Sequence, residues 1–265
     1  MPAVDIARLR IQSAGVTDHF DDPVQLLRAL HEMFDLYADR TRRPGQLASP
    51  VTVLPSYNIP PPALHQLEAD LGLQAEDRDE ETITLADALW EDGHLECRLL
   101  AAYLLGRIRP RGDDFMDRLT DWVSKTREPN VRRTLLSMSL GRLRREDPDR
   151  FLRLMGRWVH PTRHKMWSSA IQALLPLLDD PDFHNLPVVF DIVKPIIELG
   201  TPTLQNEIAE LITALYQASP TETAVYLRQT ALASSHPQTR LTLRRILSRL
   251  PEPLRESIAG VARGG

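Results

Sequence analysis

The stretch Leu104-Leu105-Gly106-Arg107-Ile108 occurs in five related copies along the chain, and this recurrence sets the architecture. The other copies are Ser139-Leu140-Gly141-Arg142-Leu143, Ala173-Leu174-Leu175-Pro176-Leu177, Leu211-Ile212-Thr213-Ala214-Leu215 and Ile246-Leu247-Ser248-Arg249-Leu250. Their last residues are separated by 35, 34, 38 and 35 positions. Recurrence at this period is typical of stacked helical hairpins, because each hairpin buries its apolar face against the next one. The sequence therefore predicts an all-α solenoid.

Each repeat is predicted to contain two helices. The first helices are expected over 83–92, 112–126, 148–158, 187–199 and 220–233. The second helices are expected over 94–108, 129–144, 162–178, 202–217 and 237–249. Asp147 and Ser219 precede prolines at helix starts and are expected to cap them. Pro176 and Pro195 lie inside helical patterns and are expected to bend or end those helices.

Residues 1–82 precede the repeats and are predicted to form an N-terminal helical cap with a proline-rich extended segment. The strongest helix is expected over 23–39, where Asp22 can cap the first turn. Weaker helices are expected over 4–15 and 61–72. The intervening segment, 41–62, is rich in proline, which removes amide donors and favours extended backbone. Its scattered apolar residues predict that it packs along the helices.

The composition is that of a globular chain with enough apolar residues for a continuous core. Of the 265 residues, 42% are hydrophobic, and in a repeat protein this core is shared between neighbours. No run approaches the roughly 18 apolar residues of a membrane span, and Asp5 stands where a signal peptide would need apolar residues. The single cysteine, Cys97, fits a reducing compartment. We therefore expect a cytoplasmic protein with no membrane partner.

Charge is strongly segregated along the chain, although the net charge is only −4. Residues 1–97 hold 7 Lys/Arg and 18 Asp/Glu, a balance of −11. Residues 98–165 hold 17 and 8, a balance of +9, and residues 166–265 hold 8 and 10, a balance of −2. A basic block within an acidic protein is typical of a surface that binds polyanions. Arginines that merely solvate the surface and pair with nearby carboxylates would produce the same pattern.

Within the first repeat, a set of residues forms the pattern LW…E…R…AA…LL, namely Leu89-Trp90, Glu96, Arg98, Ala101-Ala102 and Leu104-Leu105. This pattern resembles the DNA alkylation repair glycosylases, a family of HEAT-like repeat enzymes. The resemblance lies in the sequence of 85–108 and in the architecture of 83–250. It implies a curved solenoid whose second helices line a basic concave groove for duplex DNA. The expected fold class is therefore all-α, a right-handed α-solenoid of HEAT-like helical hairpins, with five such repeats over 83–265.

The family also implies a Trp-Asp-x-Val-Asp-like stretch one repeat later, whose Asp and flanking Trp residues excise positively charged alkylated purines. At that place this chain reads Glu128-Pro129-Asn130-Val131-Arg132-Arg133, with no Trp and no Asp. A cationic leaving base needs a carboxylate beside its sugar and aromatic faces against its charge, and Asn130 and the arginines supply neither. A shifted register leaves only Asp117 and Asp121 as weak catalytic candidates. We therefore expect a protein that binds without catalysing.

The basic residues of the repeats suit binding to phosphates. An alignment of the repeats places Arg98 opposite Arg133, and Lys165 beside the position of Arg132. Guanidinium groups at regular spacing neutralise phosphates without reading the base sequence. The predicted nucleic-acid-binding residues are Arg98, Arg132, Arg133, Arg163, Lys165 and Trp167.

Trp167 enters this set because it falls on a second helix beside the basic residues, where an exposed ring would stack on a base. Trp90, Trp122 and Trp158 fall late in first helices, and we expect them in the core between repeats.

The sequence predicts no cofactor and no metal site. His94 with Cys97, and His160 with His164, have spacings that a metal could use, but no further thiolate or histidine cluster accompanies them. Two functions from different classes stay open. One is a noncatalytic module that binds nucleic acid through a central basic groove. The other is a scaffold whose groove holds an acidic protein or peptide; an active alkylpurine DNA glycosylase is a third and weaker hypothesis.

Overall fold

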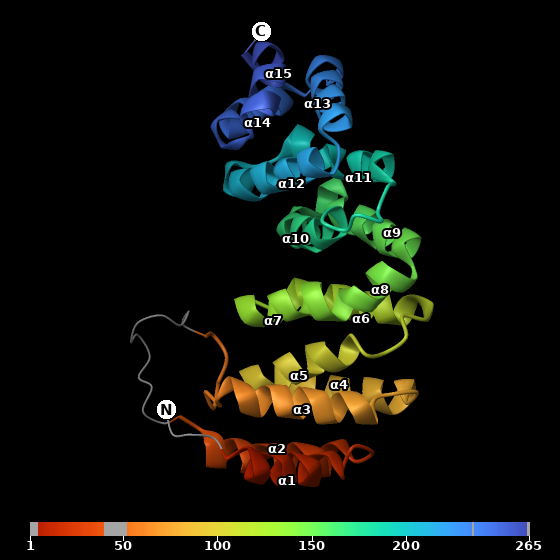
Figure 1. Ribbon diagram of the computed structural model, residues 1–265, viewed down its shortest axis with the longest axis vertical. Helices are drawn as coiled ribbons and strands as arrows, with labels where there is room; N and C mark the ends of the chain where they lie inside the picture. Colours follow the sequence, from red (N-terminus) through yellow and green to blue (C-terminus); the bar gives the residue numbers. More distant parts are fainter. Residues whose placement is uncertain (1–4, 40–51, 235, 264–265) are drawn as a thin grey trace. The chain divides into compact units, whose positions relative to one another are not determined.

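The computed structural model describes residues 5–39, 52–234 and 236–263, and it divides the chain into two compact units, Met1–Leu143 and Arg144–Gly265 (Figure 1). We call them the N-terminal unit and the C-terminal unit. Within the described residues every regular element is helical, and no strand occurs. The prediction of an all-α fold is therefore confirmed. Part of the predicted proline-rich segment, 40–51, lies outside the described residues.

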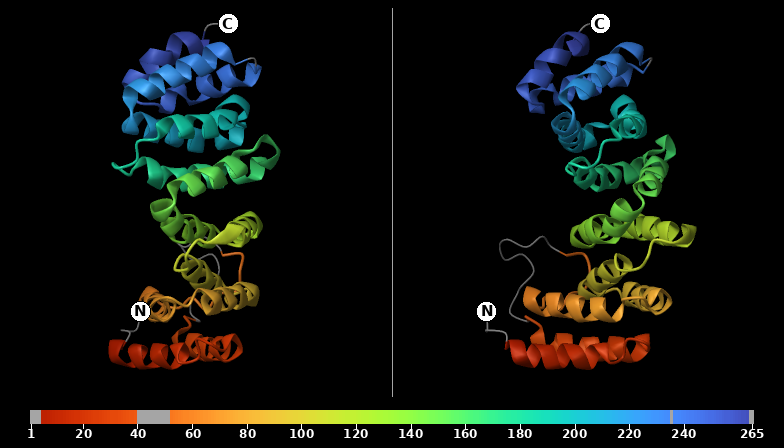
Figure 2. Two further views of the ribbon diagram at one scale, coloured as in Figure 1. Left: turned by 90° about the vertical axis from the view of Figure 1, so that its right-hand side faces the viewer. Right: turned by 45° about the vertical axis from the view of Figure 1, so that its right-hand side comes forward.

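The helices of the N-terminal unit form two alternating sets. Consecutive contacts link α1, α3, α5 and α7 in one set, and α2 with α4 in the other. Figure 2 shows the helices of this unit, from red to yellow-green, stacked one above the next. The bounds are α1 Ile6–Thr17, α2 Pro23–Tyr37, α3 Pro61–Gln74, α4 Asp79–Asp92, α5 Leu95–Leu105, α6 Gly112–Lys125 and α7 Pro129–Thr134. A π-helical turn, η1 Leu135–Ser139, continues α7 and leads into α8, Leu140–Glu146.

The C-terminal unit repeats this alternation. Contacts link α9, α11, α13 and α15 in one set and α10, α12 and α14 in the other. The α-helices are α9 Pro148–Val159, α10 Trp167–Leu178, α11 Leu186–Leu199, α12 Gln205–Ala218, α13 Pro220–Ala233, α14 Pro237–Ile246 and α15 Glu252–Arg263. Short 3₁₀ turns, η2 Pro161–Met166, η3 Pro202–Leu204 and η4 Leu247–Arg249, begin or end the second helices of the pairs.

The helix ends follow the sequence signals in most places. Asp22 accepts hydrogen bonds from the Val24 and Gln25 amides at 3.1 Å, and Asp147 accepts one from the Arg150 amide at 3.0 Å, as predicted for caps. The prediction that Ser219 caps α13 is wrong, because the Ser219 hydroxyl makes no hydrogen bond to the first turn of that helix. Pro176 and Pro195 do not end their helices, since α10 continues to Leu178 and α11 to Leu199.

Consecutive repeats touch through side chains about one period apart. The rings of Trp90 and Trp122 stack with centroids 4.2 Å apart, joining α4 to α6. In the C-terminal unit, Phe190 and Tyr226 stack at 4.5 Å, joining α11 to α13. Trp90, Trp122 and Trp158 are all at most 5% exposed, so the prediction that they are core residues is confirmed.

Gly106, in the repeated stretch quoted first, lies where two repeats approach backbone to backbone. A Cβ atom at Gly106 would stand 2.5 Å from the carbonyl oxygen of Met138 in η1. Beside it, the Ser139 hydroxyl donates to the Ala102 carbonyl at 2.6 Å, and the Arg142 guanidinium donates to the Arg107 carbonyl at 2.7 Å. The end of α5 is thus bonded directly to the helix one period later.

We predict that Gly106→Ala lowers the free energy of unfolding by about 1–3 kcal/mol, because the new methyl group meets a backbone oxygen that no side-chain rotation can move. Gly15→Ala is the matched control, since no atom lies within 4 Å of its Cβ position in α1. There we expect a gain of about 0.5–1 kcal/mol from the lower entropy of the unfolded chain. Urea unfolding followed by circular dichroism measures both, and effects of equal sign would contradict the packing described.

Candidate functional site

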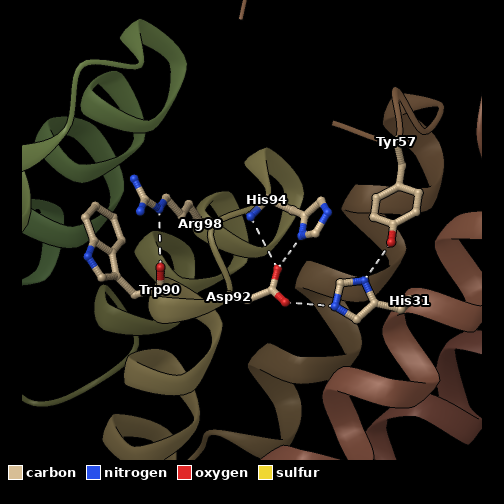
Figure 3. Close-up of polar contacts among 6 residues, drawn as sticks. All are labelled: His31, Tyr57, Trp90, Asp92, His94 and Arg98. Carbon is tan, nitrogen blue, oxygen red and sulfur yellow. Dashed lines mark hydrogen bonds and ion pairs between the residues drawn. The ribbon is translucent and has the colours of Figure 1, made fainter. Parts of the chain in front are cut away.

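The first predicted binding residue, Arg98, lies in the first turns of α5 and is partly committed to an internal contact. Its guanidinium carbon sits 4.9 Å from the centroid of the Trp90 ring, and its Nε donates to the Trp90 carbonyl at 3.3 Å (Figure 3). The half-buried side chain is therefore held in one orientation by cation–π attraction and a hydrogen bond. Neither contact occupies the terminal amino groups of Arg98.

The next two predicted residues lie on α7, which packs directly against α5. Arg132 is half-buried, and its Nη2 donates to the Thr126 carbonyl at 2.6 Å while its buried Nε has no hydrogen-bond partner. Arg133 is exposed, and its side chain has no ion pair within the described part of the chain. The structure thus brings Arg98, Arg132 and Arg133 onto two neighbouring helices, with Arg133 the most accessible of the three.

A buried carboxylate that the sequence reasoning missed stands at the expected position of the catalytic motif. Glu128 is the residue before α7, and it is 1% exposed. Its Oε2 accepts a hydrogen bond from the Val53 amide at 3.0 Å, and its Oε1 is buried with no hydrogen-bond partner. Nothing in the sequence indicated that Glu128 is buried, because a charged residue at a helix start is usually exposed. The Val53 amide that binds it lies 75 positions earlier.

Glu96 is a second buried carboxylate, and it lies in the first turn of α5, the second helix of the preceding repeat. It is 3% exposed, and its Oε1 accepts from the Ser56 hydroxyl at 2.7 Å and from the Asn58 amide at 2.9 Å. The Leu95 amide donates to the Pro55 carbonyl at 2.9 Å. Residues 52–60, which we call the strap, therefore cross the N-terminal ends of α5 and α7. For these residues the prediction that the proline-rich segment packs along the helices is confirmed.

The remaining predicted binding residues belong to the C-terminal unit. Arg163 and Lys165 are exposed in η2 and make no ion pair with other described residues. Trp167, however, is fully buried at the start of α10, and its Nε1 donates to the His160 carbonyl at 3.3 Å. The prediction of Trp167 as a surface aromatic is therefore wrong. The 3₁₀ turn η2 leads directly into Trp167 and sets the direction of its side chain, which points into the core. The exposed His164 ring packs on the Trp167 ring, with centroids 4.5 Å apart.

The two weak catalytic candidates lie on α6. Asp117 is exposed, and Asp121 is half-buried and forms an ion pair with Lys125 at 2.8 Å. The Trp122 ring next to Asp121 in sequence is 4% exposed and stacked on Trp90, so it offers no free face to a base.

A second polar cluster lies in the N-terminal unit, between α2, the strap and the α4–α5 turn. Asp92 is the last residue of α4, and its two carboxylate oxygens face the rings of His31 and His94, each at 2.8 Å (Figure 3). The Tyr57 hydroxyl lies 2.9 Å from the other ring nitrogen of His31. Gly93 makes the sharp turn between the helices with φ of +87°, which places Asp92 beside the first turn of α5.

The buried thiol of Cys97, in that first turn, completes this cluster. Burial acts to raise the pKa of Asp92, but hydrogen bonds from Cys97, His94 and His31 outweigh it and lower that pKa to about 2. Burial, followed by the charge of Asp92, raises the pKa of the Cys97 thiol well above its usual range. Asp92 is therefore the fixed negative charge of the cluster. The sequence offered His94 and Cys97 as neighbours but could not show that the fold adds His31 and Asp92.

Comparison with protein families identifies the chain. The family model described as DNA alkylation repair enzyme matches residues 32–247, from within α2 to within η4. Because the match covers most of the chain, the protein belongs to the DNA alkylation repair enzyme family. Neither the curated proteins nor the solved structures contain a match to this sequence.

No helix in the described residues is both long enough and apolar enough to cross a membrane.

Proposed function

We propose that this protein is a noncatalytic member of its family that binds duplex nucleic acid through the basic second helices of HEAT-like repeats. The observation that carries the proposal is the contact between α5 and α7, which puts Arg98 on one helix and Arg132 and Arg133 on its direct neighbour, all within the basic block. In the C-terminal unit, the exposed Arg163 and Lys165 offer further positive charge at the start of a second helix. We propose further that the alternating helices form a right-handed α-solenoid of five such repeats over 83–265.

The binding that we propose consists of contacts to phosphates and not to bases. Arginine donors held by their own backbone and ring partners are already oriented, which reduces the entropy lost on binding. Trp167 is buried, and Trp90 and Trp122 are stacked on each other, so these rings offer no exposed platform for a base. We therefore propose that the protein follows the phosphate backbone and has little preference for base sequence.

The absence of catalysis is supported by the residues at the expected motif position. Glu128 supplies a carboxylate there, but its oxygens are buried and one accepts from the strap, so it cannot approach a sugar. Arg132 and Arg133 follow it and would oppose a developing positive charge on that sugar. Asp121 lies on α6, not on α7, and is paired with Lys125 of the same helix.

We predict that the logarithm of the affinity for a duplex falls linearly with the logarithm of the salt concentration. Arg133→Ala should reduce that slope by about one unit and weaken binding to all duplex sequences alike. The double change Arg163→Ala with Lys165→Ala should reduce it by about two units. Fluorescence anisotropy with labelled duplexes of two unrelated sequences measures both effects.

Arg10→Ala is the control for this experiment, because Arg10 is an exposed residue of α1 outside the basic block. It should leave both affinity and salt slope unchanged. Binding that is insensitive to salt, or equally affected by the Arg10 change, would overturn the proposal. Retention of an acidic peptide with no affinity for duplexes would instead favour the scaffold function.

We also predict that incubation with duplex DNA carrying N-methylated purines releases no methylated base above the level seen without protein. Chromatography of the free bases after incubation provides the measurement. A release that Asp117→Asn or Asp121→Asn abolishes would show that the chain is a working glycosylase with a relocated carboxylate.

A further inference from the structure

The cluster around Asp92 contains donor atoms that the nucleic-acid proposal does not use. His31, Asp92 and Cys97 each offer one metal-ligating atom, and these three atoms lie within 4.8 Å of one another. They come from α2, from the end of α4 and from the first turn of α5. A tetrahedral zinc ion with bonds of about 2.0–2.3 Å needs ligand atoms roughly 3.3–3.8 Å apart. Shifts of about an ångström would therefore bring all three ligands to bonding distance.

The geometry points to a zinc site in which His31 Nε2, Asp92 Oδ2 and Cys97 Sγ bind one divalent ion. This combination of imidazole, carboxylate and thiolate is of the borderline-soft kind that zinc prefers, whereas magnesium and calcium require oxygen ligands throughout. The thiol proton leaves when the ion binds, because the thiolate is the ligand form of cysteine.

The residues around the three ligands are arranged as the outer shell of such a site. Without an ion, Nε2 of His31 donates to Asp92; when the ion binds, the ring proton moves to Nδ1, where the Tyr57 hydroxyl at 2.9 Å can accept it. The His94 ring nitrogen and its amide both face Oδ1 of Asp92, at 2.8 and 3.3 Å, which leaves Oδ2 directed at His31. These partners direct the ring and the carboxylate toward the site, and ion binding then needs only the shift of about an ångström and the loss of the Nε2 proton.

The histidine side chains of the site are partly open to solvent, and the thiol is not. The side chains of His31 and Asp92 are 28% and 13% exposed, and that of His94 is 31% exposed, whereas Cys97 is fully buried. The fourth ligand is then a water molecule or the ring of His94, whose nitrogen would turn from Asp92 Oδ1 to the ion. A thiol held at the N-terminal end of α5 also benefits from the helix dipole once it becomes a thiolate.

Cobalt(II) and zinc(II) titrations of the full chain test this site. The protein is used without an affinity tag, reduced, and freed of metal with a chelator. Cobalt should produce a thiolate-to-metal charge-transfer band in the near ultraviolet that saturates at one ion per chain. Zinc should displace the cobalt with the same stoichiometry. A wild-type protein that shows no such band overturns the proposal.

Variants assign the ligands. We expect Cys97→Ser to lose the charge-transfer band and His31→Ala and Asp92→Ala each to weaken zinc binding by more than about tenfold, measured by competition with a chromophoric chelator. Tyr57→Phe should weaken it by about tenfold through loss of the outer-shell bond. His65→Ala is the matched control, because this exposed histidine of α3 pairs with Glu68 outside the cluster, and it should bind zinc as the wild type does.

Far-ultraviolet circular dichroism shows whether each variant folds. Where a ligand variant is folded and still binds zinc with wild-type affinity, that residue is not a ligand and the proposed site is wrong. Where a variant does not fold, Tyr57→Phe and the wild-type cobalt spectrum decide the question. Salt-dependent duplex binding is measured separately, so a failure of the zinc site and a failure of the proposed function can be told apart.

Discussion

The close approach of α5 to η1 is the constraint on which the rest of the N-terminal unit depends. Gly106 meets the Met138 carbonyl where a methyl group would not fit, and Ser139 and Arg142 bond to carbonyls one period earlier. Backbone contact of this kind leaves little freedom in how the second helices face each other. It therefore also determines where Arg98 and Arg133 stand relative to one another, and with them the basic surface that we assign to binding.

Two buried carboxylates hold the strap at the N-terminal ends of α5 and α7. Glu96 and Glu128 stand one repeat apart, and each accepts hydrogen bonds from the strap. Buried carboxylates are costly unless such donors compensate them, so the strap and the helix ends stabilise each other. The consequence for function is direct. In the function that we propose, the place at which the resemblance predicts a catalytic stretch holds Glu128, bonded to the strap, and two arginines.

Regular, local features could be predicted from the sequence. The repeated stretches located the helix pairs, since apolar periodicity and prolines at helix starts are signals within a single repeat. The helix α15 was missed although Leu254 and Ile258 are buried on one face, because it follows the last copy of the repeated stretch. Trp167 was misassigned because a 3₁₀ turn, which the sequence did not reveal, directs its side chain into the core.

Features that depend on distant residues could not be predicted. The burial of Glu128 depends on Val53, and the partner of Asp92 on α2 is His31, which is 61 positions earlier. A pattern within one repeat cannot predict such pairs, because the two partners lie in different repeats or outside them. These pairs define both the strap and the proposed zinc site.

Hydrogen–deuterium exchange with and without a duplex would test most directly whether this protein binds nucleic acid through its basic second helices. Our account predicts slower exchange in peptides that cover α5, α7 and η2, at low salt and with duplexes of unrelated sequence, while α1 exchanges at an unchanged rate. Unchanged exchange throughout the chain, or slower exchange confined to α1 and α2, would contradict it.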